Sequence, residues 1–225
     1  MRRVDPLVPP RLRVSNQEVY SAALRGERCT MLGLAGDAVH MPVERWSADA
    51  DVSDNRVLDH CKGSTIDIGC GPGRMTVELA LRGAQSLGID LVAEAVGQAR
   101  ARGASAIVGD VFEQVPSEGE WDTALLADGN IGIGGDPVAL LRRARGLVHS
   151  RGRVVVDLAP PGSGHVRMTL RLKVGELTSE PFAWSVVAPE ALQAVAAEAG
   201  YRVRSVEQVG PRWFADLRVG RSRCR

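Results

Sequence analysis

The chain has 225 residues, a net charge of +1 at pH 7 and a hydrophobic content of 44%, which suits one globular domain with added segments. No apolar run approaches the ~20 residues that a membrane helix needs, and the balanced charge offers no field that would attract nucleic acid. Pro6, Pro9 and Pro10 interrupt the region where a signal peptide would be apolar. We therefore expect a cytoplasmic protein with neither a membrane nor a nucleic-acid partner.

The four cysteines lie far apart in the sequence and include no C-x-x-C pair. This spacing favours reduced thiols and predicts no metal site.

Residues 1–60 precede the first predicted strand and are expected to form a helical or irregular segment. Ser15-Asn-Gln-Glu18 is a capping box, which predicts a helix that continues through about Leu24. We expect residues 61–220 to form the main domain and residues 221–225 to form a basic tail.

From Ser64 to Leu158, short apolar runs alternate with amphipathic segments, which is typical of βα units that build a parallel sheet. The predicted strands cover residues 65–68, 85–89, 105–108, 123–127 and 153–158. One intervening helix presents the apolar residues Val92, Ala95, Val96 and Ala99. Another begins at Asp136-Pro137, an N-cap followed by a proline at the first helical position.

The C-terminal part contains a predicted helix from Pro189 to Gly200 and two strands, residues 201–209 and 212–219. The turn between these strands, at Gly210-Pro211, is so short that they must pair antiparallel. Before them, residues 160–187 form an insert. This insert contains a proline- and glycine-rich loop and a predicted hairpin of residues 165–173 against residues 182–187.

The stretch from Ile66 to Arg74, IDIGCGPGR, joins a predicted strand to a predicted helix through three glycines. Such a turn places backbone N–H groups and the positive end of a helix dipole at one point, which suits an anionic or carboxylate-bearing ligand. The dinucleotide fingerprint G-x-G-x-x-G/A fails, because Arg74 stands in its third glycine position.

The loop does match the pattern Asp-x-Gly-x-Gly-x-Gly, and further landmarks follow it in order: Asp90 at the end of the second strand, Gly109-Asp110-Val111 after the third and Trp121-Asp122 at the fourth. Over residues 55–219 the chain resembles the class I S-adenosylmethionine-dependent methyltransferases. The resemblance implies an α/β, doubly wound, mostly parallel seven-stranded sheet with helices on both faces. Its strand order would be 3-2-1-4-5-7-6, with the last strand antiparallel.

The resemblance also implies roles in binding S-adenosylmethionine. Asp67 and the glycine loop would meet the methionine moiety, Asp90 both ribose hydroxyls, and Asp110 the adenine amino group. The complete set implied for the cofactor is Asp67, Gly69, Cys70, Gly71, Gly73, Asp90, Leu91, Asp110, Val111, Ala127 and Asp128.

For the methyl acceptor we expect a small molecule, with Asp128 and Asn130 facing the transferred methyl group and His165 in reach as a base. Residues 1–60 and the inserted hairpin would cover the acceptor side. Met31, Met41, Trp46 and Trp184 are candidates for an apolar wall, and Arg45, Arg167 or Arg212 for receiving an anionic group.

Other interpretations remain open at this point. Each glycine or aspartate, taken singly, could be an ordinary turn or capping residue. A nicotinamide-dependent oxidoreductase would use the same sheet and Asp90, and a non-catalytic S-adenosylmethionine-binding protein would keep the cofactor residues without an acceptor pocket. The oligomeric state is expected to be a monomer or a homodimer.

Overall fold

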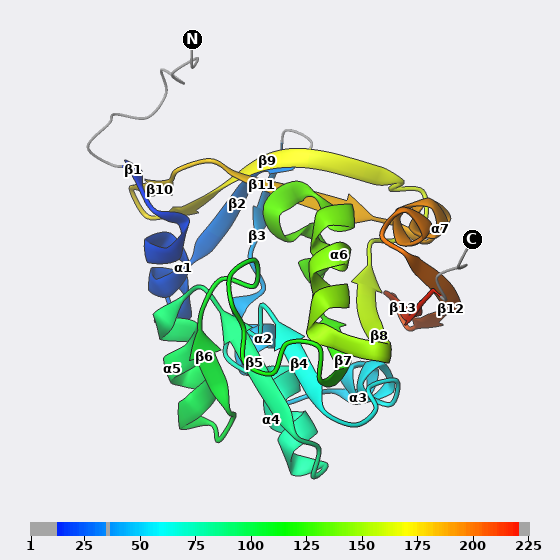
Figure 1. Ribbon diagram of the computed structural model, residues 1–225. Coiled ribbons are helices and arrows are strands. Elements are labelled where there is room, and N and C mark those ends of the chain that lie inside the picture. Colours follow the sequence, from blue (N-terminus) through cyan, green and yellow to red (C-terminus); the bar gives the residue numbers. More distant parts are fainter. Residues whose placement is uncertain (1–12, 35–36, 221–225) are drawn as a thin grey trace.

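The computed structural model describes residues 13–34 and 37–220. Its main element is a seven-stranded sheet with the strand order β12-β13-β8-β7-β4-β5-β6 (Figure 1). The strands are β4 (Thr65–Ile68), β5 (Ser86–Asp90), β6 (Ala106–Val108), β7 (Trp121–Leu126), β8 (Val148–Leu158), β12 (Tyr201–Val209) and β13 (Arg212–Val219).

The strand directions confirm the predicted topology. The neighbours from β6 to β8 pair parallel, whereas β13 pairs antiparallel with both β8 and β12. Counted along the sheet, this is the order 3-2-1-4-5-7-6 with the seventh strand reversed.

Helices cover both faces of this sheet, and alternate residues of a strand pack against opposite layers. On β8, Val154 and Val156 join a cluster with residues of α6 (Pro137–Leu147) and α7 (Pro189–Glu198). Val155, between them, packs with residues of α3 (Val52–Leu58) and α4 (Arg74–Leu81). A strand buried on both faces explains the uninterrupted valines of this segment. Helix α5 (Ala93–Ala101) lies beside α4.

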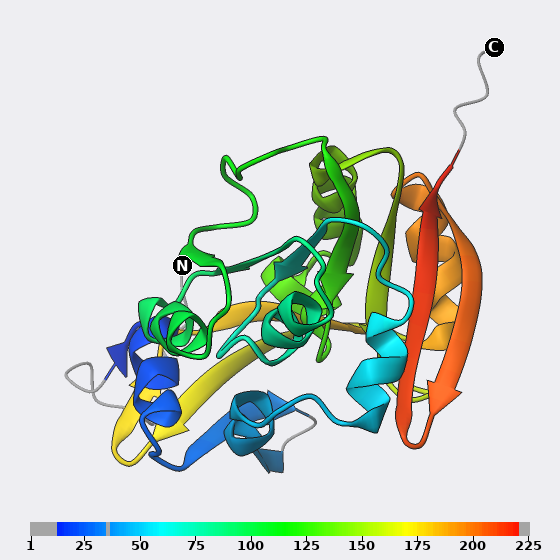
Figure 2. The same ribbon diagram turned by 90° about the horizontal axis from the view of Figure 1, so that it is seen from below.

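A second sheet lies across the carboxyl ends of the parallel strands, and its order is β1-β10-β9-β2-β3, with β11 also paired to β9 (Figure 2). Its strands are β1 (Arg13–Val14), β2 (Cys29–Leu34), β3 (Asp37–His40), β9 (His165–Val174), β10 (Leu177–Ser179) and β11 (Phe182–Val187). The predicted hairpin is confirmed, since β9 pairs antiparallel with β11 from His165 opposite Val187 to Leu170 opposite Phe182.

The leading segment differs from the expectation, because it contributes the strands β2 and β3 as well as helices. Strand β2 pairs with β9, with Met31 opposite Leu172. Strand β3 is a local antiparallel partner of β2. Strand β9 belongs to the distant insert, and the sequence of residues 29–40 does not indicate that second pairing. The predicted capping box is confirmed at the start of α1 (Asn16–Leu24), and α2 (Val43–Ser47) follows β3.

Gly73, at the start of α4, has a φ of +86°, and a Cβ added there would lie 2.7 Å from the Cβ of Ala99 on α5. We expect Gly73→Ala to lower the free energy of unfolding by about 2–5 kcal/mol, from overpacking and a strained φ together. The matched control is Gly103→Ala, with a φ of +92° and no atom within 4 Å of an added Cβ. It should lose only about 1–2 kcal/mol in urea unfolding. Equal losses would show that α4 and α5 do not need this close approach.

Candidate active site

A cavity of about 490 Å³ lies between the carboxyl ends of β4, β5, β6 and β7 and the inner face of the second sheet. This is the position at which open α/β sheets bind ligands. Its volume falls within the range of small-molecule sites.

Ten of the eleven residues predicted to bind the cofactor line this one cavity. They are Asp67, Gly69, Cys70, Gly71, Asp90, Leu91, Asp110, Val111, Ala127 and Asp128. Gly73 does not line it, and the tight contact with Ala99 gives that glycine a packing role between α4 and α5.

Asp90 ends β5 and joins the glycine loop to the start of α5. Its Oδ2 accepts a hydrogen bond from the backbone N–H of Gly71 at 2.9 Å, and its Oδ1 accepts one from Val92 at 2.9 Å. Burial raises the pKa of this carboxyl group. Each carboxylate oxygen has a second lone pair, so both can still accept hydrogen bonds from a ligand.

Asp67 lies at the floor of the cavity and is only 1% exposed. Its Oδ2 accepts a hydrogen bond from the Thr76 hydroxyl at 2.7 Å. Burial nevertheless raises the pKa of Asp67 to about 7. A carboxyl group poised near neutrality becomes fully charged when a cation is bound beside it.

This raised pKa predicts a pH-dependent penalty on stability. The folded protein binds the Asp67 proton more tightly than the unfolded chain, so the stability falls as the pH rises from about 4 to about 7. Asp67→Asn removes the penalty. We expect the free energy of unfolding of the variant, relative to the wild type, to increase by about 2 kcal/mol between pH 5 and pH 7.

The control for this measurement is Asp51→Asn. A hydrogen bond from the Ser53 hydroxyl contributes most to lowering the pKa of Asp51, which is about 2. Asp51 is thus ionised at both pH values, and its substitution should shift stability equally at pH 5 and pH 7. A pH-independent effect of Asp67→Asn would contradict the raised pKa.

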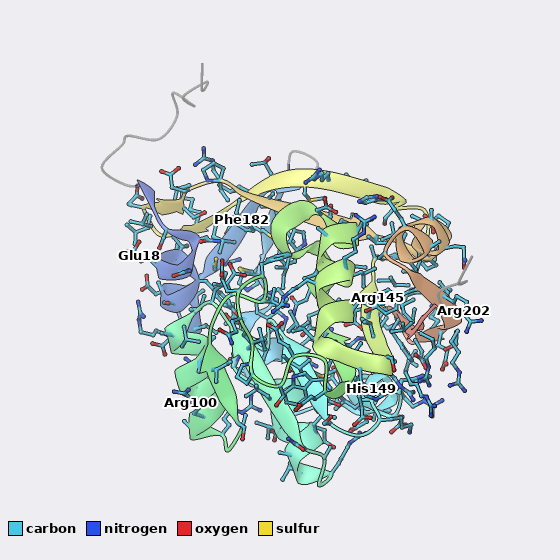
Figure 3. All side chains as sticks on the ribbon, viewed as in Figure 1. Glu18, Arg100, Arg145, His149, Phe182 and Arg202 are labelled. Atoms are coloured by element: carbon cyan, nitrogen blue, oxygen red, sulfur yellow. The ribbon has the colours of Figure 1, made fainter. Side chains whose placement is uncertain are left out.

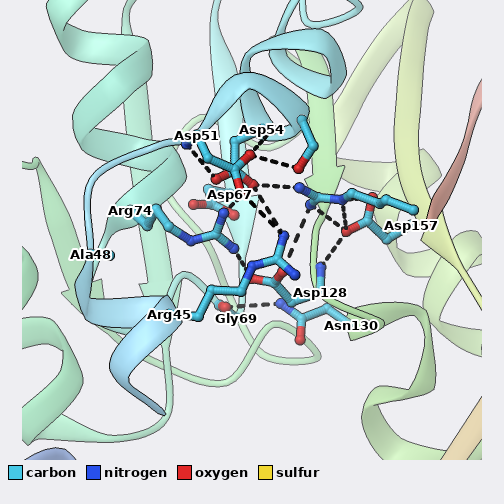
Figure 4. Close-up of polar contacts among 12 residues, drawn as sticks. Arg45, Ala48, Asp51, Asp54, Asp67, Gly69, Arg74, Asp128, Asn130 and Asp157 are labelled. Carbon is cyan, nitrogen blue, oxygen red and sulfur yellow. Dashed lines mark hydrogen bonds and ion pairs between the residues drawn. The ribbon is translucent and has the colours of Figure 1, made fainter. Parts of the chain in front are cut away.

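A buried ionic network lies beside the glycine loop (Figure 4). Arg74 of α4 pairs with Asp54 of α3 and with Asp128 after β7. Arg212, the first residue of β13, pairs with Asp54 and Asp157, and its Nε lies 2.9 Å from Asp157 Oδ2. Arg74 and Asp54 are 3% and 1% exposed, so each charge is stabilised by its ion partners and not by water.

The pKa shifts in this network follow from burial and pairing. Although burial raises the pKa of Asp54, the hydrogen bond and charge of Arg74 bring it below its ordinary value. For Asp157, burial outweighs Arg212, and its pKa is raised.

The network holds the loop after β7 in a fixed shape. Asp128 has a φ of +51°, and its backbone N–H donates to Asp157 Oδ2 at 2.6 Å. Asn130 starts the 3₁₀ helix η2 (Asn130–Gly135), and its side-chain amide donates to the carbonyl oxygens of Ile68 and Gly69 at 2.8 and 2.9 Å. Both residues line the cavity, but Asn130 uses its N–H groups to tie η2 to the glycine loop.

The third predicted catalytic residue, His165, is not brought to the cavity. It is exposed at the start of β9, opposite Val187. His149 pairs with Asp122 at 3.0 Å and lies far from Phe182 of the second sheet (Figure 3). The described residues therefore place no histidine in the cavity wall.

None of the three arginines suggested as receptors for an anionic group lines the cavity. Arg212 is committed to the ionic network, and Arg167 is an exposed residue of β9 outside the cavity. Arg45 is half-exposed and lies 3.9 Å from both Asp51 and Asp54.

The apolar side of the cavity is confirmed as a cluster in space: Met31, Met41, Trp46 and Trp184 all line it. Sequence reasoning missed Leu170, Leu172 and Phe182 on the same wall, as well as Tyr20 of α1. It also missed the roles of Arg74, Asp54 and Asp157. Only the Asp51–Asp54 capping box and an arginine at the start of α4 gave a local signal.

Comparison with known proteins agrees with this geometry. Residues 65–152 match the family model described as a methyltransferase domain. No curated protein sequence is significantly similar to the chain.

Among solved structures, an S-adenosylmethionine-dependent methyltransferase from Bacteroides fragilis, in complex with S-adenosyl-L-homocysteine, has a TM-score of 0.78 at 19% identity. The alignment covers 95% of this chain and 98% of that one. The 1,6-didemethyltoxoflavin-N1-methyltransferase of Burkholderia thailandensis, with bound 1,6-didemethyltoxoflavin and S-adenosylhomocysteine, has a TM-score of 0.57 at 16% identity, covering 79% and 81%. The CcbJ methyltransferase of Streptomyces caelestis has a TM-score of 0.58 at 13% identity, covering 78% and 92%.

The chain therefore has the fold of the class I methyltransferases. Residues 65–152 lie within that fold and are the part of the chain that matches the methyltransferase domain model. Within the described ranges, no helix is both long and apolar enough to cross a membrane.

Proposed function

We propose that this protein transfers the methyl group of S-adenosylmethionine to a small-molecule acceptor. The observation that carries the proposal is the division of one cavity into two unlike halves. The carboxylates and glycines at the strand ends form one half, and the apolar side chains of the second sheet form the other.

The strand-end half fits the cofactor. Asp90 would accept hydrogen bonds from both ribose hydroxyls, Asp110 from the adenine amino group, and Leu91 would cover the adenine ring. Asp67 would offset the charge of the ammonium group. Gly71 has a φ of +53°, and a Cβ added there would meet only the Tyr20 hydroxyl, at 3.4 Å. The glycine thus leaves its side of the cavity open to a ligand.

When bound, S-adenosylmethionine supplies a methyl group attached to a positively charged sulfur. This sulfur is the leaving group and becomes a neutral thioether. The protein then has to align the acceptor with that methyl group and exclude water. The network around Arg74 and Arg212 fixes the loop that carries Asp128 and Asn130. The second sheet covers the cavity on the side opposite the strand ends. This agrees with an acceptor side formed by residues 1–60 and the insert.

The size of the cavity supports a small acceptor, since about 490 Å³ has to hold the cofactor as well. The Burkholderia neighbour, which acts on 1,6-didemethyltoxoflavin, shows that this fold can accommodate such a substrate.

Calorimetric titration of the full chain tests the proposal. We expect S-adenosylhomocysteine to bind with a micromolar dissociation constant, and NADH to show no heat of binding. Binding of NADH without binding of S-adenosylhomocysteine would overturn the proposal in favour of an oxidoreductase. Binding of S-adenosylhomocysteine without release of it from S-adenosylmethionine against a metabolite library would instead favour a non-catalytic binding protein.

A further inference from the structure

Resting on the proposed function, we infer that the acceptor is a planar, uncharged aromatic molecule that carries a nucleophilic nitrogen, held in the half of the cavity under the second sheet. This subsite is defined by Tyr20, Met31, Trp46, Leu172, Phe182 and Trp184.

The face of the second sheet that lines the subsite is apolar throughout. Residues opposite each other in antiparallel strands share a face, and alternate residues of one strand do too. Met31 lies opposite Leu172, and Phe182 lies opposite Leu170. All four line the cavity, and Trp184, two residues after Phe182, continues the same face. A charged acceptor group placed against this wall would lose its hydration without gaining a partner.

Two aromatic pairs contribute to the wall from different elements. Tyr20 of α1 and Trp46 of α2 meet edge to face, with ring centroids 6.1 Å apart. Phe182 and Trp184 of β11 do the same at 6.4 Å. Ring faces and edges favour an aromatic ligand over a saturated one of the same size. Met31 and Met41 add flexible thioethers, which also pack well against rings.

The described cavity wall contains four carboxylates. The proposed function assigns Asp67, Asp90 and Asp110 to the cofactor, and the fourth, Asp128, is not a free general base. Asp128 is ion-paired with Arg74 and lies 3.7 Å from Arg212. Burial, with the nearby charge of Asp90, raises the pKa of Tyr20, and burial raises the pKa of Cys70. Neither group can remove a proton near neutral pH. An alcohol or phenol needs such a base, whereas a neutral nitrogen already presents a lone pair.

The transfer is balanced without a further reactant. The lone pair of the acceptor nitrogen forms the new N–C bond, and the methyl–sulfur bond breaks with its electron pair remaining on sulfur. The positive charge moves from sulfur to nitrogen, and a proton carried by that nitrogen leaves to water.

Saturation-transfer NMR on the protein saturated with S-adenosylhomocysteine tests the subsite. Three fragment classes of equal size are compared: uncharged nitrogen heteroaromatics, their saturated analogues, and aromatic carboxylates. We expect the heteroaromatics to bind at least about 10-fold more tightly than the other classes. Trp184→Ala should weaken them about 3- to 10-fold, while Trp184→Phe, which keeps an aromatic ring, stays within about twofold.

Leu177→Ala on β10, outside the cavity, is the surface control and should change nothing. Equal binding of all classes, a preference for carboxylates, or no effect of Trp184→Ala would overturn the assignment of the subsite. A second assay supplies S-adenosylmethionine to fragments that bind and that carry either an amino or a hydroxy group at the same ring position. Methylation on oxygen, or on neither atom, would overturn the assignment to nitrogen. Failure of S-adenosylhomocysteine to bind would instead refute the proposed function, independently of the fragments.

Discussion

Asp54→Ala is expected to lower the free energy of unfolding by about 3–5 kcal/mol, the cost of removing one partner from a buried ion pair. Asp54 contacts both Arg74 and Arg212, and it also accepts the hydrogen bond from the Asp51 N–H that completes the capping box of α3. Without Asp54, Arg74 and Arg212 both lose the buried carboxylate that they share. Urea unfolding at neutral pH measures the loss.

Asp59→Ala is the matched control, because Asp59 is at the end of the same helix but half-exposed, with Arg82 at 3.1 Å. Its loss should stay below about 1 kcal/mol, as for other surface ion pairs. If the two variants unfold at the same urea concentration, the network contributes nothing specific to stability.

Asp90→Ala should weaken binding of S-adenosylhomocysteine by about 100-fold or more. In the proposed complex the two ribose hydroxyls donate hydrogen bonds to the Asp90 carboxylate, each worth about 1.5–3 kcal/mol, and the substitution would remove both. It also frees the Gly71 and Val92 N–H groups that now hold the loop against β5. Isothermal titration calorimetry measures the loss directly.

Two further measurements make the Asp90 result specific. Asp110→Ala removes a single predicted hydrogen bond, donated by the adenine amino group, and should cost about 10- to 100-fold, less than Asp90→Ala. A thermal unfolding scan shows whether the Asp90 variant is folded. Unchanged affinity in a folded Asp90→Ala variant would mean that the ribose is held elsewhere.

The seven-stranded sheet was predictable because each of its elements has a local signature. The valines of residues 153–158 indicate a strand buried on both faces, and Asp136-Pro137 marks the start of α6. The second sheet was only half predictable. Its hairpin lies within one stretch of sequence, whereas β2 is stabilised by a partner more than a hundred residues away, and the pattern of residues 29–34 contains no trace of that partner.

The same distinction divides the site. The residues predicted to bind the cofactor follow the ends of successive strands, so a linear motif predicts that they meet in space. The ionic network joins α3, α4, the end of β7, β8 and β13, and a sequence does not show which of its 27 acidic residues will lie beside Arg74. Gly73 fits the motif but lies against Ala99, because the third glycine of this loop serves helix packing.

The pairing of β2 with β9 also bears on the order in which the molecule assembles. The residues of the strand-end half of the cavity, from Asp67 to Asp128, lie in one continuous stretch of the chain, so we expect it to form before the C-terminal part is complete. The second sheet that covers it requires β2 and β9, which lie far apart in the chain. Until β9 has been synthesised, β2 can pair only with β3. We expect the crevice to stay uncovered during that period, when a chaperone or the cofactor itself has access to it.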